Sequence, residues 1–208
     1  MGLCRIKMKK HSGFTLMEMM VVLVIIGILA AAFYPAISNL PERGKVNEVK
    51  ARLVAISAAI ESYRTVEGEY PSDYLPSGIA VNSINNRSEA LFLALYDAEY
   101  TGQRPSEEWL VNTDNDEATR NITMLGNRSL FELGDSWGNP IVYFDSLHYA
   151  DRQSTIVMLD IEYGNEAEVS PHRNEKTDSF SSPNSFQLVS AGSDGEFGTD
   201  DDIYSFSN

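Results

Sequence analysis

The sequence predicts an α+β fold, in which a long N-terminal helix packs against a small antiparallel β-sheet. Two observations carry this prediction. An uncharged apolar run and then an amphipathic pattern fill the first third of the 208 residues, and short runs rich in β-branched and aromatic residues follow from residue 129 onward. Helical and strand patterns segregated along a chain in this way are typical of α+β domains.

The N-terminus carries a basic leader followed by an apolar helix. Residues 19–33 read MMVVLVIIGILAAAF without a charge, and together with residues 14–17 they approach the ~20 residues that cross a bilayer. The positive charges of RIKMKKHSG (5–13) should stay on the cytoplasmic side. We therefore expect a leader over residues 1–13, a transmembrane and assembly helix over 14–40, and an exported globular domain over 41–208.

The junction between leader and helix reads Gly13-Phe14-Thr15-Leu16-Met17-Glu18. This run resembles the cleavage signature that type IV prepilins share with the pseudopilins of type II secretion. The resemblance implies that a prepilin peptidase cuts between Gly13 and Phe14 and that the new N-terminal residue, Phe14, is N-methylated. It also marks Glu18 as the one charge retained in the apolar helix.

Glu18 has a physical interpretation of its own. A carboxylate inside a transmembrane helix costs roughly 2.5–3.5 kcal/mol, so it should persist only with a partner. The nearest candidate is the α-amino group of Phe14 in a neighbouring subunit, and such a buried pair would set the stagger between subunits. We therefore predict an assembly role for Glu18, with a glutamate that snorkels to water at the membrane edge as the alternative.

Two more helices are expected in the globular domain. Apolar residues spaced by three and four predict an amphipathic helix that ends near Gly68: Val46, Val49, Leu53, Ile56, Ile60 and Tyr63. Weak helix formers and prolines predict a kink or local unwinding between Gly27 and Gly44. Ser88 is predicted to cap a short helix through about Ala98, with Leu91, Phe92 and Leu95 inward.

Five runs are predicted to form an antiparallel sheet on the long helix: residues 129–133, 141–144, 155–161, 186–190 and 203–206. Two stretches, 101–128 and 164–184, lack apolar periodicity, and we expect them to be surface excursions. Within the first, the TDNDE run at 113–117 is predicted to be a solvated loop, with a weak cation site as the alternative.

The C-terminal segment is strongly acidic. Its carboxylates are Asp194, Glu196, Asp200, Asp201 and Asp202, with glycines between them and no basic residue. Closely spaced oxygen ligands on a glycine-rich loop suit Ca²⁺, whereas zinc would need nitrogen or sulfur ligands that are not near. The composition alone leaves a solvated acidic turn equally open. We call residues 191–203 the acidic loop.

A second resemblance bears on the acidic loop. DSWGNPIVYFD (135–145) together with this loop resembles the major pseudopilin of type II secretion, whose last loop binds calcium. The resemblance implies that Asp194 is an early ligand and that Asp201 and Asp202 are the later pair, with Asp200 competing. Calcium would then stabilise a domain that cannot form a disulfide, because the only cysteine is Cys4, in the leader. Trp137 is expected to be a structural anchor.

Composition excludes several function classes. The formal charge is −14, and removing residues 1–13 takes Lys and Arg from 16 to 12 against 30 acidic residues, which gives −18. Such a charge argues against a nucleic-acid partner. The three histidines, His11, His148 and His172, have no serine, cysteine or metal-ligand constellation, so we expect no enzyme activity.

The two resemblances imply a structural subunit of a type II secretion pseudopilus. Its expected partners are copies of itself, other pilin-like subunits, the prepilin peptidase and an inner-membrane assembly platform. It would sit in the inner membrane with a periplasmic globular domain. A type IV pilin of a surface fibre is the alternative, although pilins often close their C-terminal region with a disulfide. A membrane-anchored binding domain or hydrolase is a third possibility.

Overall fold

The computed structural model of the chain describes residues 14–38, 40–79, 82–151, 154–160, 164–174 and 176–206. The predicted leader, including Gly13, lies outside these ranges. The chain divides into two compact units, Met1–Pro41 and Glu42–Asn208.

The first unit is built on helix α1 (Leu16–Ser38). The helix continues through Gly27 and Pro35, so the predicted unwinding does not begin at the glycine. Its regular hydrogen bonding ends at Ser38, and Asn39 lies outside the described ranges. Within the described residues, no helix reaches the combination of length and apolar character that a membrane crossing requires.

Helix α2 (Leu40–Glu67) confirms the predicted amphipathic pattern. Val49, Leu53, Ile56 and Ile60 are buried, and Val46 and Tyr63 pack against them at the edge of the core. The helix stops at Gly68, whose φ of +91° is a conformation that glycine adopts without steric cost. The Gly68 amide donates to the Arg64 carbonyl across this last turn, at 2.9 Å.

Helix α3 (Asn86–Tyr96) starts two residues before the predicted cap, so the assignment of Ser88 as the N-cap is wrong. The N-cap residue is Asn85, in the left-handed region at φ 56°, and its side chain does not cap the helix. The Asn85 amide side chain is engaged by residues distant in sequence instead. Leu91, Phe92 and Leu95 are fully buried, as predicted.

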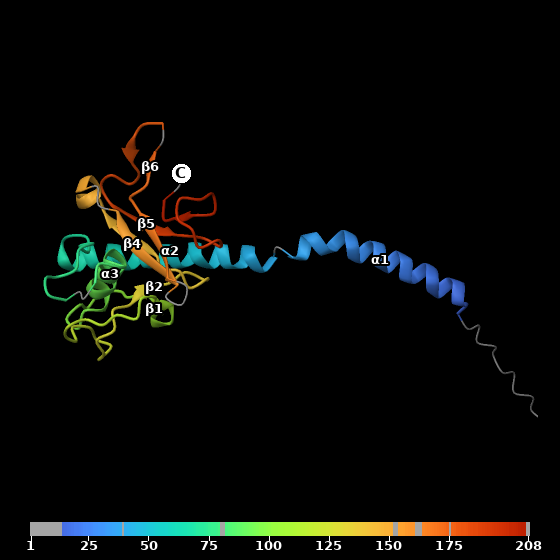
Figure 1. Ribbon diagram of the computed structural model, residues 1–208, viewed down its shortest axis with the longest axis horizontal. Helices are drawn as coiled ribbons and strands as arrows, with labels where there is room; N and C mark the ends of the chain where they lie inside the picture. Colours follow the sequence, from blue (N-terminus) through green and yellow to red (C-terminus); the bar gives the residue numbers. More distant parts are fainter. Residues whose placement is uncertain are drawn as a thin grey trace, which may run out of the picture. The chain divides into compact units, whose positions relative to one another are not determined.

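The largest sheet is antiparallel and has the order β3 (Val142–Asp145), β8 (Phe186–Ser190), β9 (Ile203–Tyr204). Three further antiparallel pairs surround it: β1 (Leu110–Val111) with β2 (Glu132–Leu133), β4 (Thr155–Asp160) with β5 (Asn165–Val169), and β6 (Arg173–Asn174) with β7 (Ser179–Phe180). All five predicted strand runs contain a strand, and β8 matches its prediction residue for residue. In Figure 1, β4 and β5 run across the direction of α2, whereas β1 and β2 are seen below it and β6 above it.

The described residues of 164–184 lie mostly at the surface, as predicted, but they form regular strands and reach the core at Val169. This stretch supplies β5, β6 and β7, and Val169 is buried where it pairs with Thr155. The pairing explains the result, because β5 alternates acidic residues with Ala167 and Val169 and so presents one apolar face to the core. Residues 101–128 are largely irregular, as predicted, but they also hold β1 and the buried Asp116.

The central sheet is buried on both faces. Along β3, Tyr143 belongs to the core that contains α2 and α3, whereas Val142 and Phe144 belong to a second core with Val157 and Val169. This alternation follows from the two-residue period of a strand. The Tyr143 hydroxyl donates to the Pro71 carbonyl at 2.7 Å, which satisfies its polar end inside the core.

Candidate functional site

The prepilin-like signature begins helix α1 with a capping box. The Glu18 carboxylate accepts from the Thr15 amide and from the Thr15 hydroxyl, each at 2.8 Å. The Thr15 hydroxyl oxygen accepts from the Glu18 amide at 3.3 Å. This reciprocal pattern satisfies amides that the first helical turn leaves unbonded. Glu18 therefore fixes the start of α1 within one chain, next to Phe14.

The large apolar side chains of the first unit are exposed from Phe14 to Leu29. Phe14 is 78% exposed and Leu16 80% exposed, and the large apolar residues from Met17 to Leu29 are all at least 43% exposed. A continuous apolar surface of this extent marks a region that a membrane or other protein chains cover. The unit thus presents Phe14, the Glu18 carboxylate and the exposed apolar side chains up to Leu29 together.

The SWGNP turn is organised by Asp135, a residue that the sequence analysis did not single out. Asp135 Oδ1 accepts from the Trp137 and Asn139 amides, at 2.8 and 2.9 Å, and Asp135 Oδ2 accepts from the Ser190 hydroxyl at 2.8 Å. The Trp137 indole packs against the main core and donates to Glu42 at 3.0 Å. Trp137 is therefore a structural anchor, as predicted.

The acidic loop is held together by Asp201. Its Oδ2 accepts from the Ser193 amide, the Ser193 hydroxyl and the Asp194 amide at 2.7 to 3.1 Å, and its Oδ1 accepts from the Thr199 hydroxyl at 2.6 Å. Burial acts to raise the pKa of Asp201, but these hydrogen bonds outweigh it and hold the pKa well below its ordinary value. Most of the hydrogen-bonding capacity of Asp201 is thus used inside the loop.

Asp202 is the carboxylate of this loop best suited to a metal. Its Oδ2 accepts from the Gly198 amide and the Tyr204 hydroxyl, whereas its Oδ1 is buried without a hydrogen-bond partner among the described residues. Burial raises the pKa of Asp202. Asp194 is exposed and accepts from the Glu196 amide through Oδ1, and Asp200 is exposed. The described part of the loop does not bring three carboxylates to within 4.8 Å of one another.

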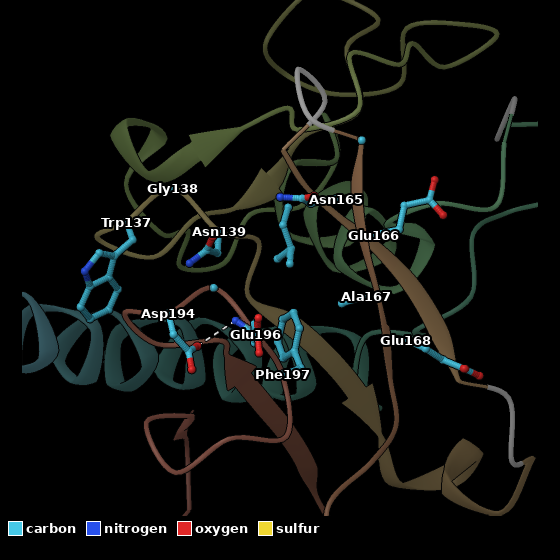
Figure 2. Close-up of a pocket in the computed structure, with 13 residues that line it drawn as sticks. Trp137, Gly138, Asn139, Asn165, Glu166, Ala167, Glu168, Asp194, Glu196 and Phe197 are labelled. Atoms are coloured by element: carbon cyan, nitrogen blue, oxygen red, sulfur yellow. Dashed lines mark hydrogen bonds between the residues drawn. The ribbon is translucent and has the colours of Figure 1, made fainter.

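An open groove of about 740 Å³ lies beside the acidic loop. Figure 2 shows it between the SWGNP turn, strand β5 and the loop, with Trp137, Asn165, Glu166, Asp194 and Phe197 among its lining residues. The loop and the turn are joined by Asn139, whose Nδ2 donates to the Gly192 carbonyl at 3.3 Å. The groove is acidic, and the described residues that line it include no serine, cysteine, histidine or lysine.

The tightest group of carboxylates lies elsewhere, at the start of α3. Burial raises the pKa of Glu89 to about 10 and the pKa of Glu132 to about 8, with neighbouring carboxylates adding to both effects. Asp116 is buried, which corrects the prediction of a solvated loop at 113–117, and its pKa is raised to about 7. The sequence offered only the TDNDE run as a weak cation site, and it did not indicate Glu89 or Glu132, because the members of the group come from three separate segments.

Comparisons with known proteins agree with these features. The family model "Prokaryotic N-terminal methylation motif" matches residues 8–34. The type II secretion system core protein G of Aeromonas hydrophila is 30% identical over 101 residues, which are 49% of this chain and 69% of that protein. The chain belongs to the family of type II secretion system core protein G. The resemblance to type IV prepilins and pseudopilins drawn from the Gly13–Glu18 signature is thereby confirmed.

Other relatives of the core protein G family match over shorter stretches. The core protein G of Pseudomonas aeruginosa is 45% identical over 64 residues, 31% of this chain and 45% of that protein. A fimbrial protein of Neisseria meningitidis serogroup B is 37% identical over 73 residues, 35% of this chain and 43% of that protein. The chain thus spans less than half the length of these two relatives. No solved structure matches it.

Proposed function

We propose that this chain is a structural subunit of a type II secretion pseudopilus. The observation that supports this most directly is the first unit, in which the signature at Phe14–Glu18 opens a helix whose apolar side chains are uncovered. The names of the core protein G relatives support secretion over other filament systems. We assign the chain no catalytic role.

The assembly step follows from the chemistry of the N-terminus. Cutting between Gly13 and Phe14 by a prepilin peptidase creates an α-amino group at Phe14, four residues before Glu18. When apolar helices pack side by side, the ammonium of one subunit can pair with the Glu18 carboxylate of the next, and a misaligned pair leaves a buried charge. Before assembly, α1 would hold the subunit in the inner membrane, with residues 41–208 in the periplasm and an assembly platform at the membrane.

Calcium in the acidic loop is the second part of the proposal. Asp202 Oδ1 is buried and unpartnered in the described structure, and Asp194 lies in the same loop. Asp201 holds the two arms of the loop together, so its contribution is to shape the site. Asp200 competes as a ligand from the exposed side of the loop. A bound ion would supply positive charge among these carboxylates and stabilise the fold by mass action.

The decisive experiment replaces Glu18 in the native cell. Glu18→Ala is compared with Glu67→Ala, which removes an exposed carboxylate of α2 outside the signature. Filaments are counted by electron microscopy, secreted proteins are measured in the medium, and mass spectrometry identifies the mature N-terminus. We expect N-methylated Phe14 in both variants, with filaments and secretion lost only in Glu18→Ala.

Other outcomes separate the competing functions. Loss of surface fibres with unchanged protein export would favour a type IV pilin, in line with the similarity to fimbrial proteins. Filaments and export that survive Glu18→Ala, on a chain that still carries residues 1–13, would favour a membrane-anchored binding domain or hydrolase.

A further inference from the structure

Carboxylates from three segments meet in the interior of the second unit. Glu89 lies in the first turn of α3, Glu132 in strand β2, and Asp114 in the turn that follows β1. One carboxylate oxygen of each lies within 4.8 Å of the other two. Asp116 adjoins them, because the Asn82 side-chain amide donates to both Asp114 and Asp116, at 3.1 and 3.3 Å. We call these four acids the carboxylate cluster.

Glu89 is the unusual member of the cluster. It is fully buried, and neither of its carboxylate oxygens has a hydrogen-bond partner within the described ranges. One oxygen each of Asp114 and Asp116 is likewise buried and unbonded there. Among the described residues, no ion pair reaches any of the four acids. An ionised carboxylate buried without a partner is costly, so Glu89 is protonated while the site is empty, and a cation that displaces this proton would give its two oxygens the partners they lack.

Polar neighbours hold the cluster in place without neutralising it. The Asn85 amide donates to Glu132 at 2.8 Å and to the Thr113 hydroxyl at 2.9 Å. The Thr113 amide donates to the second oxygen of Glu132 at 3.2 Å. Asn85 also accepts from the Met158 amide at 2.9 Å, which fixes the side chain from the opposite direction. Glu132 is thus oriented by its neighbours, as ligands of metal sites commonly are.

We propose that Glu89, Asp114 and Glu132 bind a calcium ion, with Asp116 beside them. The donors are all oxygens, which excludes a preference for zinc or copper. The free oxygens of Glu89, Asp114 and Asp116, with one lone pair from Glu132, offer most of the six to eight ligands that Ca²⁺ takes. Mg²⁺ fits less well, because it keeps several waters and this site is built largely from protein groups.

The position of the cluster indicates how an ion enters and what it does. Asp114 is partly exposed while Glu89 and Glu132 are buried, so the ion reaches the site past Asp114. Once bound, it links the irregular stretch around 112–116 to α3 and to β2. This stretch has little apolar surface of its own, and a shared ion would stabilise it where a disulfide cannot form. The site belongs to the second unit and is independent of the proposed function.

The test uses the full-length chain in detergent, in an Asp202→Asn background that removes the best ligand of the acidic loop. Bound calcium per chain is measured by calorimetric titration, and thermal midpoints are recorded in EGTA and in excess Ca²⁺. Glu89→Gln keeps the shape of the side chain and removes its charge. Glu117→Gln is the matched control, because Glu117 lies in the same segment but is exposed and paired with Arg128.

We expect the background protein and the Glu117→Gln control to bind one calcium ion and to melt higher in Ca²⁺ than in EGTA. Glu89→Gln should weaken binding by about tenfold or more and abolish the shift in the midpoint. If Glu89→Gln does not fold, Asp114→Asn at the exposed edge provides the same comparison. No calcium-dependent shift in the background protein, or an unchanged shift in both cluster variants, would overturn the proposal. Equal stabilisation by Mg²⁺ would overturn the choice of calcium.

Discussion

Among the described residues, Asp73 carries the most buried ion pair of the second unit. It is fully buried, pairs with Arg87 and His148, and accepts from the Asp145 amide at 3.2 Å. Asp73→Ala should lower the free energy of unfolding by roughly 3–5 kcal/mol, because it leaves the Arg87 guanidinium buried without its carboxylate. Urea unfolding of the full-length chain measures this loss.

The control for Asp73 is an ion pair of the same kind at the surface. Glu117 and Arg128 each keep about half of their side chains exposed, at 55%. Glu117→Ala should therefore change the free energy of unfolding by only ~0–1 kcal/mol. Equal losses in the two variants would show that burial of Asp73 adds nothing.

Asp145 should make the stability of the domain depend on pH. Burial raises its pKa, helped by the nearby Asp73 and opposed by a hydrogen bond from the Leu147 amide. Because the pKa of Asp145 is higher in the folded protein than in the unfolded chain, where it is ~3.9, protonation of Asp145 favours the folded state. This contribution to stability is complete below pH ~3.9 and is lost as the pH rises through the pKa of the folded state. Asp145→Asn should thus stabilise the domain at pH 7, with the gain vanishing below pH ~3.9. Urea midpoints across this range test it, and Asp178→Asn, at an exposed pair, should show no such trend.

At the level of elements, the acidic loop depends on a close backbone approach at Gly192. Its φ is +68°, and a Cβ there would lie 2.4 Å from the Asp201 carbonyl oxygen. Gly126 has a similar φ of +73° with open space around it. Gly126→Ala should cost ~1–2 kcal/mol from backbone strain alone, whereas Gly192→Ala should cost clearly more and weaken calcium binding. Thermal unfolding compares them, and equal costs would show that the loop can open at Gly192 without penalty.

Elements with a strong local signal were predictable from the sequence. The periodicity of α2 and the Gly68 stop are local, and β8 is a five-residue run that contains Phe186, Leu188 and Val189. The start of α3 could not be predicted from the sequence, because the Asn85 side chain binds Glu132, 47 residues away, instead of capping its own helix. Strand β5 was missed for a similar reason. Its acidic residues dominate the local sequence, and the apolar face formed by Ala167 and Val169 is recognisable only once the strand pairs with β4. For the site, local signals located the acidic loop, whereas the carboxylate cluster required the tertiary fold.

On the scale of the whole second unit, the two proposed calcium sites act on one folded domain and share no ligand. Each ion bound to the native state adds stability, about 2.7 kcal/mol at a free concentration 100 times its Kd. Asp202→Asn and Glu89→Gln should therefore each remove part of the calcium-dependent rise in unfolding free energy, and the double variant should remove all of it. The two losses should sum to within ~0.5 kcal/mol, as for sites without common partners. Denaturant titrations of the four proteins in Ca²⁺ and in EGTA measure these losses.

A sum of the two single losses that differs from the loss in the double variant by more than this would indicate that the two sites are coupled. The coupling would pass through the segment from Glu132 to the Asp135 turn, which joins β2 to the acidic loop through Ser190 and Asn139.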